Sequence, residues 1–246
     1  TLSLHDALPI LLEASVIQWQ WKEDVFPECD QFNGIHEGLV QSWKDIFPKK
    51  GEIHFAGALE NNEDTGTLQY LASTAMEAGF STRVLDMQAL DLQNGRFFDP
   101  AGELVNRCFK LYPWEWMVDE SPDGCLAEME WLEPIWKLVM SNKAILATLY
   151  ELFPDSPYVL PCYLSRPRSG LFCKKPVFSR EGHNVSVVDI RDWEEYVRIA
   201  ETEGDYNTGA YVYQEYVEPT AYSGRYPVIG SWIIGGEAAG IGIREN

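Results

Sequence analysis

The segment from residue 172 to 188 carries the residues with the clearest chemical potential in this sequence. A predicted strand delivers Lys175 next to a proline, and a short loop with Ser179, Arg180 and Gly182 follows. Backbone N–H groups, a hydroxyl and a guanidinium in such a loop can lie over a polyphosphate, and the lysine adds a point charge. The segment suggests an anion-binding loop; an exposed hairpin with ordinary surface charges is the alternative. It is not a Walker A loop, because no GxxxxGK[ST] pattern is present.

Two further cations stand in notable surroundings. Lys143 interrupts the apolar stretch 135–149, where a charge needs an anion or an acidic partner. The alternative is a lysine that extends its charged end into solvent. Arg244 follows a glycine-containing strand and could reach a reacting phosphoryl oxygen, or could be a surface arginine.

Two polar pairs complete the set of candidate residues. Gln214 and Glu215 lie in a strand that breaks at Pro219, which suits a hinge between two lobes but also fits an amphipathic edge strand. Glu63 and Asp64 follow the first buried strand, and parallel α/β sheets bind ligands at this end of their strands. Carboxylates there favour an ammonium group on a ligand, although acids at a helix start are stabilising in any case.

The hydrophobic pattern predicts the elements that position these residues. In the first half, strand, helix and strand follow one another with the lengths of a βαβ unit, which indicates a parallel sheet. The second half is rich in β-branched residues and is expected to be largely antiparallel. The fold class is therefore α/β, or α+β. Helices are expected at 11–21, 31–43, 65–78, 132–152 and 193–200, and strands at 53–59, 82–87, 107–112, 171–178, 184–189, 211–217, 226–234 and 239–243, with a hairpin turn at Gly235-Gly236.

Composition excludes several classes of function. With 246 residues, 46% hydrophobic and 13% aromatic, the chain can build a core, so disorder is excluded as its main state. A net charge of −19 makes it a poor generic binder of nucleic acids and of anionic membrane surfaces. No apolar run reaches the ~18–20 residues of a membrane span. The 5 cysteines form no CxxC and the 4 histidines show no ligand spacing, so we predict neither a zinc ribbon nor a histidine-based metal site, and we expect a reducing, cytoplasmic location.

The two ends of the sequence predict a fragment. Residues 1–10 (TLSLHDALPI) lead into neither a helix cap nor a strand, and we interpret them as a non-native tail. The segment 239–246 is interpreted as a strand that stops within a domain.

A series of motifs, in order from residue 11 to 245, resembles the synthetase domain of the glutathionylspermidine synthase family and its relatives without an amidase domain. The most specific are KLYPWEW (110–116), SNKAIL (141–146) and KPVFSREGHNV (175–185). The resemblance implies an ATP-grasp-like fold, preceded by an α/β substrate region. We therefore expect a tail at 1–10, a substrate-binding region at 11–137 and an incomplete nucleotide-binding region at 138–246.

The resemblance also implies an activity: an ATP-dependent carboxylate–amine ligase that works through an acyl phosphate. Its cofactors would be ATP and Mg²⁺, and its substrates a glutathione-like acid and a polyamine-like amine. The family's metal ligands fall upstream of residue 11, so this fragment is expected to be inactive. The alternatives are a polyamine- or peptide-binding module without turnover, and a ligase for another acid and amine.

By motif, each candidate residue acquires an expected role. Lys143 and Lys175 resemble the ATP phosphate contacts, and Arg180 the arginine that closes over the acyl phosphate. The remaining expectations are nucleotide contacts at Gln214 and Glu215, a phosphate or intermediate contact at Arg244, and a peptide or polyamine contact at Glu63 and Asp64.

Overall fold

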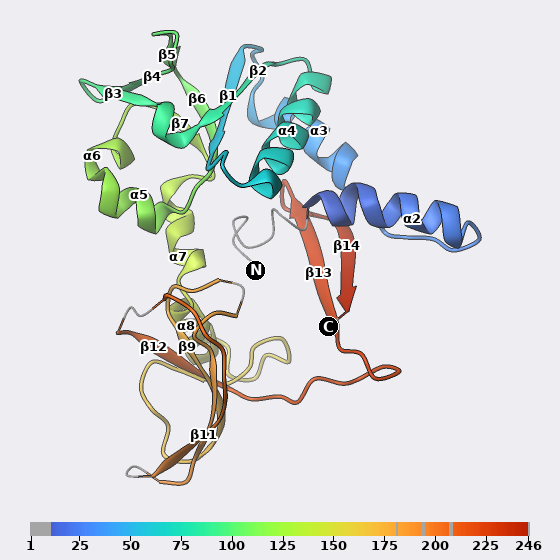
Figure 1. The fold of residues 1–246 in the computed structure, drawn as a ribbon, viewed down its shortest axis with the longest axis vertical. Coiled ribbons are helices and arrows are strands. Elements are labelled where there is room, and N and C mark those ends of the chain that lie inside the picture. The colour runs from blue at the N-terminus through green and yellow to red at the C-terminus, as the bar shows by residue number, and fades with distance from the viewer. Residues whose placement is uncertain (1–10, 181, 193–194, 207–208, 246) are drawn as a thin grey trace. The chain divides into compact units, whose positions relative to one another are not determined.

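The computed structural model describes residues 11–180, 182–192, 195–206 and 209–245 (Figure 1). Contacts divide the described chain into two units. We call residues 11–135 with 220–245 the parallel-sheet unit, and residues 136–219 the antiparallel-sheet unit. The expected nucleotide-binding region 138–246 is thus distributed over both units, and the expected tail at 1–10 lies outside the described residues.

A four-stranded sheet with all strands parallel forms the centre of the parallel-sheet unit. Its order is β2-β1-β6-β7, and helix α4 connects β1 to β2. The predicted βαβ unit is therefore confirmed. The strands are β1 (Glu52–Gly57), β2 (Ser81–Asp86), β6 (Arg107–Leu111) and β7 (Glu130–Leu132).

Helices α3 (Ile35–Ile46) and α4 (Asn62–Glu77) pack together, and α4 packs on the sheet (Figure 1). The indole of Trp43 lies 5.7 Å from the ring of Phe55, centroid to centroid, and its Nε1 donates a 2.9 Å hydrogen bond to Thr74 Oγ1. Phe55 is fully buried, so its truncation to alanine would cost about 3–5 kcal/mol. This aromatic core joins α3 and α4 to β1.

Gly57 ends β1 where strand and helix approach most closely. A Cβ atom there would lie 2.9 Å from the carbonyl oxygen of Leu111 and 2.9 Å from Leu68 Cδ1. Glycine lets β1, β6 and α4 come together at this point.

Further elements complete the parallel-sheet unit. The β13–β14 hairpin turns at Gly235 and Gly236, whose φ values of 61° and 90° suit a tight hairpin, as predicted. The remaining elements are η1 (Glu13–Ile17), α2 (Gln18–Val25), η2 (Met87–Ala89), β3 (Asp91–Gln93), β4 (Arg96–Phe98), β5 (Leu104–Val105), α5 (Trp114–Glu120), α6 (Pro122–Cys125), β13 (Pro227–Ile234) and β14 (Glu237–Glu245).

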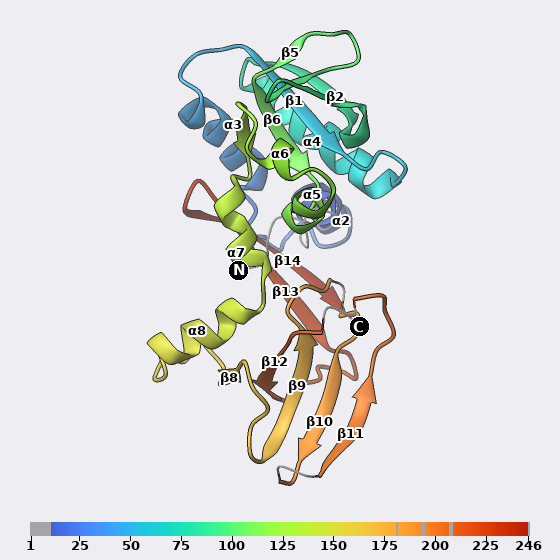
Figure 2. The same ribbon diagram turned by 90° about the vertical axis from the view of Figure 1, so that its left-hand side faces the viewer.

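The antiparallel-sheet unit contains a five-stranded sheet of order β11-β10-β9-β12-β8, visible in Figure 2. Every pair of neighbouring strands is antiparallel, as expected for this half of the chain. Helix α8 packs on one face, where Ala147 meets Cys162 and Val212. The elements are η3 (Ile135–Lys137), α7 (Leu138–Ser141), α8 (Ala144–Leu152), β8 (Cys162–Tyr163), β9 (Gly170–Pro176), β10 (Ser186–Ile190), β11 (Tyr196–Glu201) and β12 (Tyr211–Glu215).

Three predicted helices differ from the structure. The helix at 193–200 is wrong: residues 196–201 form β11, paired with β10, and residues 193–194 lie outside the described chain. The helix predicted at 132–152 is broken. Its first residue belongs to strand β7, and Asn142 has an extended ψ of 116° between α7 and α8. The helix at 31–43 begins only at Ile35, because the Gly34 N–H donates to Ala239 of β14 instead.

Candidate functional site

Lys175 and Gln214 lie side by side on neighbouring strands of the antiparallel-sheet unit. Lys175 of β9 is paired with Val212 of β12, and Cys173 is paired with Gln214. Because side chains alternate along a strand, all four lie on one face of the sheet. The Lys175 Nζ donates a 2.7 Å hydrogen bond to Gln214 Oε1, and both side chains are half-buried.

Lys143 approaches the same region from the N-terminus of α8. Its backbone N–H donates to the Val177 carbonyl at 2.8 Å, and its Nζ donates to the Ser179 carbonyl. The side chain of Asn142 accepts the Ala144 N–H at 2.9 Å, which caps the helix directly after the lysine. Lys143 is therefore held against the loop that begins two residues after Lys175.

Arg180 adjoins this contact, since it follows Ser179 in the same loop. Ser179 is buried and Arg180 is half-buried. The structure thus brings Lys143, Lys175, Arg180 and Gln214 into one unit, although they are spread over 72 positions of sequence. Residue 181, next in the loop, lies outside the described residues.

The charge of Lys175 is not neutralised by its immediate neighbours. Its hydrogen-bond acceptor, Gln214 Oε1, is a neutral amide oxygen. Burial raises the pKa of the Cys162 and Cys173 thiols, while Lys175 lowers it, so both thiols are protonated near neutral pH. Lys175 can therefore bind an anion.

Glu215 does not share this face. The alternation of β12 directs it to the face opposite Gln214, where Tyr213 packs against the buried cluster of Phe172, Val188 and Ile190. Its side chain is exposed, and its backbone N–H donates to the Pro161 carbonyl at 2.8 Å. The structure therefore separates Glu215 from Lys175 and Gln214.

Arg244 belongs to the parallel-sheet unit. It lies on β14 with its side chain half-exposed, and its Nε is 3.4 Å from Glu13 Oε2. Gln18 holds the neighbouring Ile243 by two hydrogen bonds, donating to its carbonyl at 2.8 Å and accepting its N–H at 3.2 Å. These contacts anchor the strand on which Arg244 stands.

Glu63 and Asp64 occupy the first turn of α4, directly after the carboxyl end of β1. Asn61 caps this helix by accepting the Glu63 N–H at 2.9 Å. Asp86, at the end of the neighbouring β2, accepts the Leu59 N–H at 3.1 Å. The acidic pair therefore lies at the sheet edge where parallel α/β proteins bind ligands, as predicted from the order of elements.

The same sheet edge holds a residue that the sequence interpretation missed. Lys110 of β6 is fully buried; its Nζ donates to the Tyr112 carbonyl at 2.6 Å and lies 3.9 Å from the centre of the Trp114 ring. Burial lowers the pKa of this ammonium group to about 7. The available signal was a lysine inside the otherwise apolar segment CFKLY (108–112).

The described residues contain neither a metal-ligand cluster nor a membrane-spanning helix. No group of three or more His, Cys, Asp or Glu side chains is arranged to hold a metal ion in this part of the chain. Among the same residues, no helix has the length and apolar character to cross a membrane.

Comparison with known proteins gives several related enzymes. The chain is 35% identical to a protein of Haemophilus influenzae named "Putative acid–amine ligase", over 96% of this chain and 64% of that protein. It is 27% identical to the trypanothione synthetase of Crithidia fasciculata, over 98% of this chain and 41% of that enzyme. It is 25% identical to the bifunctional glutathionylspermidine synthetase/amidase of Escherichia coli, over 95% of this chain and 42% of that enzyme.

The chain therefore spans between about two fifths and just under two thirds of the length of these relatives. The family model described as glutathionylspermidine synthase preATP-grasp matches residues 6–246, nearly the whole sequence. The chain belongs to the glutathionylspermidine synthase preATP-grasp family.

Proposed function

We propose that this chain is part of an ATP-dependent carboxylate–amine ligase, which forms a C–N bond through an acyl phosphate. The relatives named as an acid–amine ligase and as two synthetases support this reaction class. The observation that carries the proposal is the gathering of Lys143, Lys175 and Gln214 in one unit, next to the Arg180 loop. We further propose a cytoplasmic location and small-molecule substrates, a glutathione-like acid and a polyamine-like amine.

The residues present fit a nucleotide. The Lys175 Nζ donates to a neutral amide oxygen, so it can turn toward a phosphate oxygen without breaking an ion pair. In this proposal Lys143 and Lys175 would hold the phosphates, and Gln214 would orient Lys175. Bound ATP supplies the phosphoryl group that gives the substrate carboxylate a leaving group. The described residues offer no ligand cluster for Mg²⁺.

Most of the remaining candidate residues take supporting roles in the proposal. Arg180 would offset charge that develops on the activated carboxylate, and Arg244 would contact the phosphate or the tetrahedral intermediate. Glu63 and Asp64 would bind the ammonium group of the amine substrate, since their helix begins at the ligand-binding edge of the sheet. Glu215 takes no role in this proposal, because its side chain lies on the face opposite Lys175 and Gln214.

Calorimetric titration with ATP tests the proposal. Lys175→Met should weaken ATP binding about tenfold or more, because a hydrogen bond to a charged group contributes about 1.5–3 kcal/mol. Lys174→Met is the matched control: Lys174 is the neighbour on the opposite face, where its Nζ lies 3.9 Å from the centre of the Tyr211 ring. Equal ATP affinity in both variants would contradict the assignment of Lys175.

Turnover separates a ligase from a binding module. A ligase releases inorganic phosphate only when ATP, an acid and an amine are all present. Tight binding of spermidine without nucleotide, and no phosphate release by the full-length protein under any combination, would favour the binding module instead.

A further inference from the structure

A cavity of about 760 Å³ lies at the amino-terminal edge of the parallel sheet. The first residues of β1, β6 and β7 line it, together with residues of β4 and β5. Glu63 and Asp64 follow the opposite end of β1, about 17 Å away at the rise of an extended strand. The cavity is therefore separate from the substrate contact proposed for that acidic pair.

Two ion pairs on the cavity wall neutralise themselves. The Arg96 Nη2 lies 2.8 Å from Glu128 Oε2, and the Arg107 Nε lies 2.9 Å from Glu130 Oε2. Each pair contributes one positive and one negative charge, so neither sets the net charge of the cavity.

Lys50 is a third cation on the wall, and its described partners are neutral. Its Nζ donates to the Ala78 carbonyl at 2.5 Å and lies 4.3 Å from the centre of the Phe80 ring. The side chain is exposed. Its full positive charge is available to an anionic group in the cavity.

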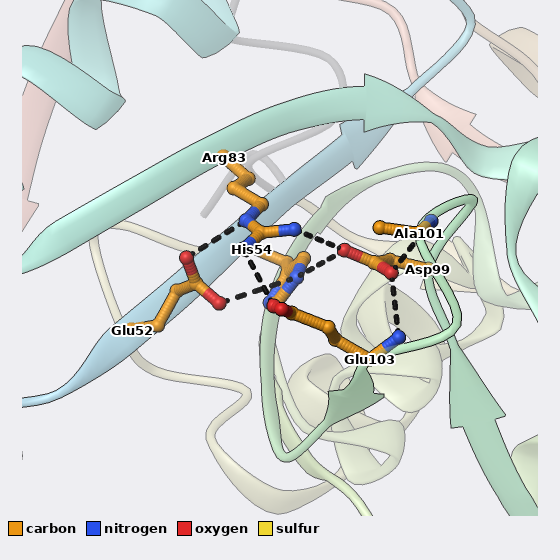
Figure 3. A network of polar contacts seen from close by, with 6 residues as sticks. All are labelled: Glu52, His54, Arg83, Asp99, Ala101 and Glu103. Carbon is orange, nitrogen blue, oxygen red and sulfur yellow. Dashed lines mark hydrogen bonds and ion pairs between the residues drawn. The ribbon is translucent and has the colours of Figure 1, made fainter.

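Glu52 gives another part of the cavity wall a negative charge. Arg83 contacts Glu52 Oε1 at 2.8 Å, but it also contacts Asp99 at 2.5 Å and Glu103 at 2.6 Å (Figure 3). The backbone N–H groups of Glu103 and Ala101, together with Arg83, lower the pKa of Asp99, which stays ionised at neutral pH. One guanidinium thus pairs with three carboxylates. The group formed by Arg83 and these carboxylates therefore carries a net negative charge.

His54 lines the cavity and lies beside these carboxylates. It is 2% exposed, and its Nε2 is 3.8 Å from both Glu52 Oε2 and Asp99 Oδ2, beyond hydrogen-bond distance. Neither ring nitrogen has a hydrogen-bond partner among the described residues. Buried polar atoms are nearly always hydrogen-bonded, so this imidazole is available to a polar ligand that enters the cavity.

We infer that the cavity binds a zwitterionic small molecule, an amino acid or a short peptide. Its carboxylate meets Lys50, its ammonium group meets Glu52, and His54 supplies a hydrogen bond. The volume lies within the range of about 300–1,000 Å³ that is usual for small-molecule sites. A ligand with only a negative charge would be repelled by the carboxylates around Arg83, and one with only a positive charge would be repelled by Lys50.

NMR titration with three matched dipeptides tests this inference. Glycylglycine carries both charges, N-acetyl-glycylglycine only the negative one, and glycylglycine amide only the positive one. Glycylglycine should bind saturably, and each capped form at least tenfold more weakly. Absence of saturable glycylglycine binding, or equal binding of a capped form, would overturn the inference.

Variants locate the binding. Lys50→Met and Glu52→Gln should each weaken glycylglycine binding at least tenfold, while Lys44→Met and Glu37→Gln, on exposed positions of α3, should leave it unchanged. Thermal melting verifies that Glu52→Gln folds; Lys50 is exposed and its variant provides the test in any case. Loss of binding in the Glu63→Gln/Asp64→Asn variant would assign the dipeptide to the other sheet edge and refute the cavity site.

The imidazole resonances give an independent readout. With only 4 histidines in the chain, the side chain of His54 can be followed by nitrogen-detected spectra. Glycylglycine should shift the His54 ring resonances and leave those of His36, on α3, unchanged. Unchanged His54 resonances at saturation would contradict the proposed hydrogen bond.

Discussion

The buried Lys110 predicts that the stability of the parallel-sheet unit rises between pH 7 and pH 9. Burial lowers the pKa of its ammonium group from 10.5 to about 7. In this pH range the unfolded chain therefore holds a proton that the folded chain lacks, and folding becomes more favourable as the pH increases. Below pH 7 both states hold the proton, and above about 10.5 neither does, so the effect ends at both limits.

The magnitude follows from the two pKa values. At about 1.36 kcal/mol per pKa unit, the full shift corresponds to roughly 5 kcal/mol. Between pH 7 and 9 the lysine contributes about 2 kcal/mol of this change, since at pH 7 the folded group is still about half protonated. Lys110→Met removes the titrating group. The free energy of unfolding of the wild type, relative to this variant, should thus increase by about 2 kcal/mol over this range.

Thiol labelling of Cys108 measures the difference. This cysteine is fully buried on the same strand, β6, so it is labelled only when the unit opens. The ratio of labelling rates, variant over wild type at the same pH, should rise about 30-fold from pH 7 to 9, because the intrinsic reactivity of the thiol cancels. Lys44→Met, at an exposed position of α3, should show a constant ratio. A constant ratio for Lys110→Met as well would mean that the buried lysine stays protonated, and would refute the reasoning.

Three further predictions concern single contacts. Gly57→Ala should destabilise the parallel-sheet unit by about 1–3 kcal/mol in urea unfolding, because its Cβ would lie 2.9 Å from the Leu111 carbonyl; an unchanged midpoint would contradict this close approach. Asn142→Ala removes the cap of α8 and should lower stability by about 1 kcal/mol, with Asn142→Asp as the conservative control that retains an acceptor. The folded-state pKa of Asp99 is lowered, so its contribution to stability is present above the unfolded pKa of the carboxyl group and is lost as the pH falls through the folded one. Wild type should therefore exceed Asp99→Asn in thermal stability at neutral pH, and the difference should disappear in acid; a difference that persists there would point to packing instead of charge.

Local patterns were sufficient for much of the fold. The segment from β1 through α4 to β2 was predictable because its apolar periods change clearly from strand to helix and back, and because Gly79 ends the helical pattern. The hairpin at Gly235-Gly236 was predictable for the same kind of reason, since two consecutive glycines tolerate the positive φ values of the turn.

Other elements depend on partners that are distant in sequence. The segment 196–201 has an acidic helical pattern, but pairing with β10 makes it the edge strand of the antiparallel sheet. The break before α8 arises because the Lys143 N–H donates to the Val177 carbonyl in another part of the chain. Neither interaction leaves a periodic signal in the sequence.

The candidate site was likewise predictable from the sequence only in part. The sequence alone determined which residue types stand at which positions: cations at Lys143, Lys175 and Arg180, and an acidic pair at the start of a helix. Only the tertiary structure decided that Lys175 meets Gln214 and that Glu215 faces away, because strand pairing fixes which side chains share a face. It also decided that Lys110 is buried, since burial depends on what the rest of the chain packs around a residue and not on its neighbours in sequence.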